Sequence, residues 1–282
     1  MRLQDALDAF LLQLAADGRS THTIRQYQRH VRQFAAFVGA DRDLATITVG
    51  DVARFLTAPP TTEGRAPATL NALRTSLRVC FKHLHEAAIA PTNPARMLRL
   101  ARCSPPPPRG LSDEEVRRLT DALVLGEGPN ARRDHMLIDV MLLAGLRLGS
   151  ALALDREDVD LESRELHLRV TKGQAPERVP VGRELLDHLV AYLADRPAGP
   201  LFTTQAGVRL GQRQAQRRIE HWLARSGAGK GASAHSMRHA FALRLYRRTR
   251  DIGLVQRALR HRSIASTLAY AHASDEDVRA AL

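Results

Sequence analysis

The chain has 282 residues, of which 44% are hydrophobic and 26% are charged, and its formal net charge is +12. At roughly 150 residues per domain this length predicts two domains, and the composition excludes general disorder, a collagen-like repeat and a disulfide scaffold. The longest apolar run, Met136–Leu146, contains Asp139 and falls short of the ~20 residues of a bilayer-spanning helix. Asp5 and Asp8 interrupt any secretory signal, so we expect by default a protein of the cytoplasm or nucleoid.

Apolar residues at helical spacing predict a compact helical domain over residues 1–102. Its helices are expected at Leu3–Leu14, Ile24–Val38, Thr48–Ala58, Leu70–Leu84 and Ala95–Arg102, with a Pro/Thr/Gly-rich loop at Pro59–Arg65. Ser20 and Thr21 are suitable N-cap residues for the second helix. Arginines occupy the faces away from the apolar stripes, and four of them are candidate DNA-contacting residues: Arg25, Arg29, Arg74 and Arg78.

Four consecutive prolines, Pro105–Pro108, follow this helical region. Proline cannot continue a helix and such a run favours an extended chain, so we interpret residues 103–110 as a linker. Ser112 and Glu115 then match a capping box, which marks the start of a new helix. The second domain is therefore expected to cover residues 111–282.

The second domain is predicted to be mainly helical with a small β-hairpin. Its helices are expected at Val116–Leu123, Asp134–Ala144, Arg183–Ala194, Gly211–Ser226, Ser236–Arg248, Ile252–Leu259 and Ser263–His272. Glu165–Val170 and Glu177–Val181 are rich in strand formers, and Thr171–Pro176 would join them with Lys172 near the start of the loop. Residues 274–282 form either a short helix that docks on a neighbouring protomer or a frayed tail. The fold class is thus mainly α, with an α+β second domain.

Positive charge is spread over both domains and concentrated in one segment. Residues 1–102 contain 14 basic and 8 acidic residues, and residues 103–282 contain 28 and 22. Residues 209–262 alone hold 14 basic residues and 2 acidic ones, and include Arg213 and Arg217 as further candidate DNA contacts. This distribution is typical of a nucleic-acid-binding protein, although a merely arginine-rich protein is the alternative.

Cysteine and histidine spacings give no sign of a metal site. Cys80 lies on the apolar face of a predicted helix, which indicates a buried structural thiol, and neither cysteine belongs to a CxxC pair. The most closely spaced histidine pairs considered are His83/His85 and His235/His239. No carboxylate or cysteine accompanies either pair at a recognised ligand spacing, so we expect no metal.

Several residues in the second domain are suited to phosphate chemistry. The chain uses only three lysines beside 39 arginines, and Lys172 in the hairpin loop can act as a general acid where an arginine cannot. His235 and Arg238 share a helix face, which combines a proton carrier with a bidentate phosphate ligand. The alternative for His235 and Arg238 is a first helix turn whose polar side chains face water, and the alternative for Lys172 is a solvated hairpin side chain. Arg147 follows an apolar helix and needs a partner, either DNA phosphate or an acid such as Asp155 or Asp158.

His261 and Tyr270 lie nine residues apart near the C-terminus. A phenol is a poor nucleophile at neutral pH unless its proton is removed and its target is made electrophilic. A phosphodiester held by two arginines meets the second condition. By itself, however, Tyr270 fits equally a half-buried packing residue.

Together these segments resemble the tyrosine recombinase (phage integrase) family, and in particular its compact Xer-like members. The family's helical, SAM-like core-binding domain is similar to LLQLAADGRSTHTIRQYQRHVRQFAAFVG. Its first catalytic box resembles LLAGLRLGSALALDREDVD, which gives Arg147, and its lysine hairpin resembles VTKGQAPERVPV, which gives Lys172. Its His-x-x-Arg box is similar to HSMRHAFALRL, and its final box resembles LVQRALRHRSIASTLAYAH. These last two supply His235, Arg238, His261 and Tyr270.

The resemblance implies site-specific DNA breakage and rejoining without metal, ATP or another cofactor. Tyr270 is implied as the nucleophile that forms a 3′-phosphotyrosine bond, with Arg147 and Arg238 on the phosphate oxygens and Lys172 protonating the leaving 5′-oxygen. His235 and His261 are implied to handle the tyrosine proton and a phosphate oxygen. Strand exchange would proceed through a Holliday junction in a homotetramer on two DNA sites, with or without a paralogous recombinase. No domain is expected before the helical one.

The sequence departs from the family pattern at three places. Ser150 stands where an acid often supports the first arginine, and Arg260 stands where a glycine usually precedes the histidine of the final box. The Lys172 hairpin contains Pro176 and differs in length from the common form. Two other functions stay open: a sequence-specific DNA-binding protein without catalysis, and a DNA-relaxing enzyme similar to type IB topoisomerases. A metal-dependent nuclease fits less well.

Overall fold

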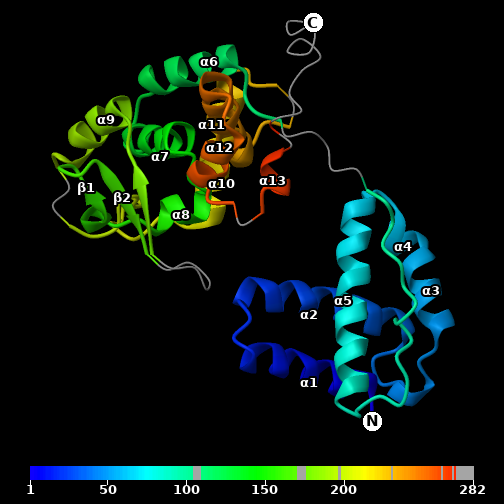
Figure 1. The fold of residues 1–282 in the computed structure, drawn as a ribbon. Helices are drawn as coiled ribbons and strands as arrows, with labels where there is room; N and C mark the ends of the chain where they lie inside the picture. Colours follow the sequence, from blue (N-terminus) through cyan, green and yellow to red (C-terminus); the bar gives the residue numbers. More distant parts are fainter. Residues whose placement is uncertain are drawn as a thin grey trace, which may run out of the picture. The chain divides into compact units, whose positions relative to one another are not determined.

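The computed structural model describes residues 1–103, 109–169, 176–195, 198–229, 231–261, 263–268 and 270. The chain divides into two compact units, Met1–Pro105 and Pro106–Leu282, which are described separately (Figure 1). The described part holds no helix that is long and apolar enough to cross a membrane.

Unit 1 is helical, as predicted. It contains α1 (Leu3–Ala16), α2 (Thr21–Val38), the 3-10 turn η1 (Leu44–Thr46), α3 (Val49–Thr57), α4 (Pro59–Thr62) and α5 (Pro67–Glu86). The prediction of a continuous loop after α3 was wrong, because Pro59 at the first position of a helix allows the one-turn α4. The predicted helix at Ala95–Arg102 was also wrong. Asn71 on α5 binds both the N–H and the carbonyl of Ala101, which holds that backbone outside a helix.

Aromatic rings form the centre of unit 1. Phe34 of α2 packs edge-on against Phe55 of α3 and Phe81 of α5, with ring centroids 5.4 and 5.6 Å away. Edge-to-face packing is the geometry that aromatic pairs prefer. Cys80 is fully buried and free, which confirms its predicted role as a structural thiol.

Unit 2 is built from helices and one small sheet. Its elements are α6 (Asp113–Val124), α7 (Ala131–Leu143), α8 (Leu148–Ala153), η2 (Arg156–Asp158), β1 (Val159–Asp160), β2 (Glu165–Leu168), β3 (Glu177–Pro180), α9 (Arg183–Leu193), α10 (Gln212–Arg225), α11 (Ala234–Thr249), α12 (Ile252–Leu259) and α13 (Ala265–Leu268). The short α8 and β1 were not predicted, because six and two residues give too little periodicity. The helix predicted at Ser263–His272 is only the single turn α13 within the described residues.

The antiparallel sheet has the order β1-β2-β3. Leu166 of β2 pairs with Val159 of β1 and Val179 of β3, and all three side chains are buried. The predicted strands of the hairpin are therefore confirmed. Residues 170–175, which would join them and include Lys172, lie outside the described part of the chain.

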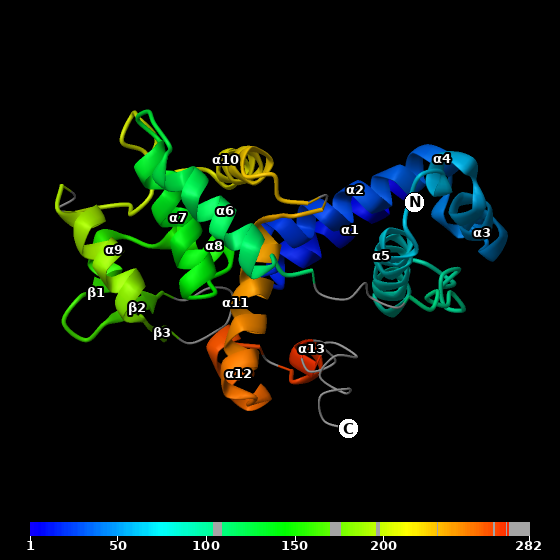
Figure 2. The ribbon, with the colours of Figure 1, turned by 90° about the horizontal axis from the view of Figure 1, so that it is seen from above.

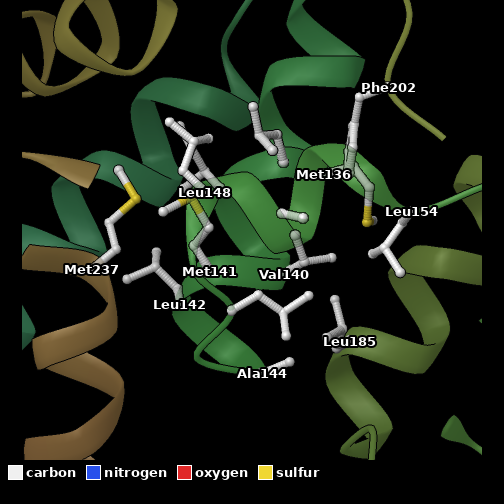
Figure 3. Close-up of a cluster of buried hydrophobic side chains, with 14 of the residues drawn as sticks. Met136, Val140, Met141, Leu142, Ala144, Leu148, Leu154, Leu185, Phe202 and Met237 are labelled. Carbon is white, nitrogen blue, oxygen red and sulfur yellow. The ribbon is translucent and has the colours of Figure 1, made fainter. Parts of the chain in front are cut away.

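Helix α7 runs through the middle of unit 2, with α9 on one side and α11 on the other (Figures 1 and 2). Residues 136–142 are all buried, as the apolar run predicted. In Figure 3 Met136, Val140 and Met141 of α7 lie among side chains from neighbouring elements, which include Leu148, Leu185 and Met237. This core fixes the C-terminal end of α7, from which the chain continues to Arg147.

A buried ion cluster around Asp134 joins α7 to α10. The Asp134 side chain is only 1% exposed and accepts hydrogen bonds from Arg133 Nη2 at 2.6 Å, Arg218 Nε at 2.6 Å and Trp222 Nε1 at 3.0 Å. The guanidinium groups of Arg133 and Arg218 therefore compensate the buried negative charge of Asp134.

We expect Asp134→Ala to lower the free energy of unfolding by about 3–5 kcal/mol, because the buried guanidinium of Arg133 loses its counter-charge. Urea titration followed by circular dichroism measures this loss. Asp195→Ala is the matched control, since Asp195 pairs with Arg132 at the surface and should contribute no more than about 1 kcal/mol. Equal losses in the two variants would contradict a structural role for the Asp134 cluster.

Candidate active site

The first turns of α11 carry three of the site's side chains. Ser233 and Ser236 cap the helix reciprocally, which fixes where it starts. His235, Arg238 and His239 then follow at spacings of three and four residues, so they lie on adjacent turns. His235 is exposed, His239 is half-buried, and Arg238 is one of the most deeply buried large side chains of the described chain.

Arg238 binds two backbone carbonyls through its guanidinium. Its Nη1 donates to the Gly145 carbonyl oxygen at 2.5 Å, and its Nη2 donates to the Leu259 carbonyl oxygen. Gly145 lies two residues before Arg147, and Leu259 lies two residues before His261. Burial, together with the charges of Arg147 and Arg260, lowers the pKa of Arg238 to about 9, so the group remains a cation at neutral pH.

Arg147 is the N-cap residue of α8 and follows a tight turn. That turn requires glycine at 145, where φ is +63° and an added Cβ would lie 2.4 Å from the ring of Phe241. The acids considered as partners of Arg147 are occupied elsewhere, because Asp155 and Asp158 both pair with Arg169. Within the described residues Arg147 has no ion-pair partner, which leaves its charge available to a ligand.

Arg147, His235 and Arg238 line one groove of about 730 Å³. Helix α10 contributes Gln212, Gln216 and Glu220 to its wall, at a spacing of four residues. Sequence reasoning had missed these side chains, although their i, i+4 spacing could have shown that they share a face. The predicted DNA contacts Arg213 and Arg217 come one position later and are exposed on α10.

Tyr270 is buried, and its hydroxyl meets His239. The side chain is 2% exposed and packs with Ala242, Val255 and Leu259. The Tyr270 hydroxyl oxygen lies 2.5 Å from Nδ1 of His239. Burial raises the pKa of Tyr270 although Arg238 and Arg147 oppose the shift, so the phenol is protonated and its O–H donates to Nδ1. His239 was absent from the predicted catalytic set, and only its position one turn beyond His235 could have pointed to it.

Burial and the charge of nearby groups keep the histidines of the site neutral. Burial, assisted by His235 and Arg238, lowers the pKa of His239 to about 4. Partial desolvation, together with the charges of Arg238 and Arg147, likewise lowers the pKa of His261 to about 4. The same causes lower the pKa of His235, although part of its side chain remains open to solvent. A neutral imidazole can accept a proton or a hydrogen bond, which a protonated one cannot.

Thr267 connects His261 to Tyr270. Its hydroxyl lies 2.9 Å from His261 Nδ1, and its carbonyl oxygen accepts the Tyr270 N–H at 2.9 Å. The backbone of His261 is in turn held by Gln256 of α12, which bonds both its N–H and its carbonyl. The segment after α12 therefore positions both residues through one threonine.

Arg260 occupies the place where the family pattern has glycine, and its backbone adopts the conformation that favours glycine. Its φ is +53° at the C-terminal cap of α12, a left-handed conformation that costs a non-glycine residue about 1–2 kcal/mol. The side chain is 13% exposed, and its Nε lies 3.3 Å from Oε2 of Glu177 on β3. This ion pair joins the hairpin strand to the turn before His261.

Five of the six predicted catalytic residues therefore lie around the first half of α11: Arg147, His235, Arg238, His261 and Tyr270. The sixth, Lys172, lies outside the described residues. In unit 1 the predicted DNA contacts Arg25, Arg29 and Arg78 are exposed, and Arg74 is half-buried with Nη1 bonded to Asn71.

The low pKa of His239 predicts a loss of stability in mild acid. The unfolded histidine binds a proton below pH ~6.5, whereas the folded one does so only near pH 4, so stability falls as the pH drops from 6.5 towards 4. The difference between the folded and unfolded pKa values limits the contribution of His239 to the free energy of unfolding to roughly 3 kcal/mol. His239→Asn keeps a hydrogen-bond acceptor near Tyr270 but does not titrate. Urea titrations across this range should show a shallower pH dependence in the variant, and identical slopes would contradict the assignment.

Comparison with known proteins places both units in one family. Residues 109–277 match the phage integrase family, and residues 7–84 match the phage integrase N-terminal SAM-like domain. The chain is 32% identical over 272 residues to tyrosine recombinase XerC of Neisseria meningitidis serogroup B, covering 94% of this chain and 89% of that protein. It is 32% identical over 273 residues to XerC of Chromohalobacter salexigens, covering 94% and 90%.

Solved structures share the fold. The XerH site-specific recombinase bound to palindromic difH substrate, a post-cleavage complex, superposes with a TM-score of 0.77 at 24% identity over 94% of this chain and 80% of that one. A lambda integrase dimer bound to a COC′ core site gives 0.78 at 18% identity over 96% and 77%. With these matches and the tyrosine–arginine–histidine site, the chain belongs to the phage integrase family and is a tyrosine recombinase, an enzyme of site-specific DNA recombination that cuts and rejoins DNA.

Proposed function

We propose that Tyr270 attacks the scissile phosphate while Arg147 and Arg238 hold its non-bridging oxygens. The observation that carries this assignment is the shared groove: Arg147, without an ion-pair partner in the described residues, and Arg238 line it together with His235. Two fixed guanidinium groups stabilise the negative charge that develops on a pentacoordinate phosphorus, and each such donor typically contributes ~10²–10³ in rate. Arg238 uses two of its five N–H groups on carbonyls and keeps the others for phosphate.

Proton transfer and further hydrogen bonding to the phosphate are assigned to the histidines near the arginines and to Lys172. His235 accepts or orients the tyrosine proton, and His261 donates a hydrogen bond to a phosphate oxygen. Lys172, in the hairpin loop outside the described residues, protonates the leaving 5′-oxygen. We add His239 to this set as a positioning residue, because its Nδ1 holds the Tyr270 hydroxyl before DNA binds. Tyr270 is buried, so its hydroxyl leaves this hydrogen bond when it reaches the phosphate.

The reaction conserves the energy of the DNA backbone. Attack by the Tyr270 oxygen forms a 3′-phosphotyrosine bond and releases a 5′-hydroxyl, and a 5′-hydroxyl of the partner strand then attacks that bond and releases the tyrosine. Each step replaces one phosphoester by another, so no ATP is consumed. Two rounds of exchange pass through a Holliday junction.

Double-stranded recombination sites are the proposed substrate, bound by both parts of the chain. Residues 1–102 serve as the core-binding domain, 103–110 as the linker and 111–282 as the catalytic domain. The relatives in solved complexes include XerH on its difH substrate and a lambda integrase dimer on a core site. By analogy we infer that two protomers bind each site and that a homotetramer joins two sites, in the cytoplasm at the nucleoid. A DNA-binding protein without catalysis is less favoured, because the chain has every residue type of the proposed catalytic set.

Covalent capture tests the nucleophile. Wild type and Tyr270→Phe are expressed in cells and lysed in denaturing detergent, and any DNA still attached to the protein is sequenced. We expect wild type to retain fragments that end at one recurrent sequence, and Tyr270→Phe to retain none. Tyr246→Phe, a tyrosine on the same helix as His239, is the matched control and should behave like wild type.

Other outcomes of this capture favour other functions. Attached DNA with scattered ends would indicate a relaxing enzyme instead of a site-specific one. Loss of capture in both tyrosine variants would mean that the phenotype reflects folding and not the nucleophile. Specific native binding without capture in wild type would support a binding protein.

The exposed arginines of α10 predict a change in salt dependence. Arg213→Gln and Arg217→Gln should each reduce the slope of log K against log salt concentration by about 1, because each removes one phosphate contact and one released counterion. Fluorescence anisotropy with a short mixed-sequence duplex measures the slope. Arg132→Gln is the control, since Arg132 already pairs with Asp195. An unchanged slope in both α10 variants would remove them from the DNA interface.

A further inference from the structure

A second cluster of chemically active side chains lies on the other side of α7 from the groove. His135 and Asp139 are one turn apart on α7, and His188 reaches towards them from α9. The groove, by contrast, is lined from α8, α10 and the start of α11, and from α7 it includes Met141 but neither His135 nor Asp139. This cluster, His135–Asp139–His188, therefore plays no part in the chemistry described above.

The three side chains direct their ligand atoms to one point. His188 Nδ1 lies 2.8 Å from Asp139 Oδ2, and His135 Nε2 lies 3.4 Å from the same oxygen. All three ligand atoms lie within 4.8 Å of one another. Around a tetrahedral ion with bonds of 2.0–2.1 Å, ligand atoms stand roughly 3.3 Å apart, so only small side-chain shifts separate this arrangement from a bound geometry.

Asp139 differs from every other buried aspartate of the described chain. Asp51 is paired with Arg42 and Arg54, Asp134 with Arg133 and Arg218, and Asp158 with Arg169. The Asp139 side chain is similarly inaccessible, at 6% exposure, yet its ion-pair partners among the described residues are two histidines and no arginine or lysine. A buried carboxylate without a compensating charge is costly, so this position calls for a cation.

The Nε2 atom of His135 supports the same conclusion. It is buried and has no hydrogen-bond partner within the described residues, although the ring itself reaches the surface. Buried polar atoms without a partner are rare, and a bound ion is one accepted reason for them. Since the two imidazole rings are partly exposed, an ion can enter from solvent.

We propose that His135, Asp139 and His188 bind one divalent transition-metal ion, with Zn²⁺ as the preferred species. Two imidazole nitrogens and one carboxylate oxygen form a donor set that suits zinc, and also cobalt, better than magnesium or calcium. A water molecule supplies the fourth ligand, or Glu184 does so, because it lies one turn before His188 and is close enough to act electrostatically on Asp139. The ion cross-links α7 to α9 and leaves the metal-independent DNA chemistry unchanged.

Metal binding by the full chain tests the proposal directly. Metal-free protein is titrated with Zn²⁺ by calorimetry, and with Co²⁺ by visible absorption, which reports a tetrahedral site. We expect one ion per chain and a thermal midpoint raised by about 5 °C when free Zn²⁺ exceeds the Kd a hundredfold. His188→Ala, His135→Ala and Asp139→Asn should each abolish the stoichiometric binding and the shift. Asp139→Asn preserves the side-chain shape, and circular dichroism verifies that each variant is folded.

His167→Ala is the matched control. Like His135, His167 has a buried Nε2 without a hydrogen-bond partner in the described chain, and it lies 3.9 Å from the Glu165 carboxylate. Among the described residues it belongs to no group of three ligand side chains, so its loss should leave binding unchanged. Absence of stoichiometric binding in wild type would overturn the proposal. Binding that survives His188→Ala but is lost in His235→Ala would place the ion in the groove and overturn it equally.

Discussion

The buried guanidinium of Arg238 determines the geometry of the whole site. Arg238 is a cation that is only 1% exposed, and two of its N–H groups donate to the carbonyls of Gly145 and Leu259. These carbonyls belong to two turns that are far apart in the sequence, and each turn presents a functional side chain two residues later. One arginine on α11 therefore sets the positions of Arg147 and His261 as well as its own.

The electrostatics of the site separate permanent cations from neutral proton carriers. Arg147 and Arg238 keep their charge in the groove, while burial and those same charges lower the pKa values of His235, His239 and His261. In the proposed mechanism the arginines bind phosphate, while the neutral imidazoles can accept a proton at neutral pH. The Tyr270 phenol stays protonated in its buried position, because burial raises its pKa and His239 accepts its hydrogen bond.

Two departures from the family pattern become intelligible in the structure. Ser150 replaces an acid, and within the described residues Arg147 is accordingly left unpaired and open to a ligand. Arg260 replaces a glycine and keeps the left-handed backbone that the turn demands, at an energetic cost. Its ion pair with Glu177 offsets part of that cost and attaches β3 to the turn that precedes His261. With arginine in place of glycine the turn costs more energy to form, but the ion pair connects the sheet to the site.

The sequence alone was sufficient for the helices with long apolar stripes, the two strands of the hairpin and the family, because these depend on local periodicity and on residue type. It failed for α8 and β1, which are too short to be periodic, and for residues 95–102, where Asn71 from another helix decides the backbone. Only the tertiary structure brings His239 to Tyr270 and pairs Asp155 and Asp158 with Arg169. It likewise brings together His135, Asp139 and His188. Contacts between residues far apart in the chain depend on how helices pack, and packing is a property of the folded core and not of any single segment.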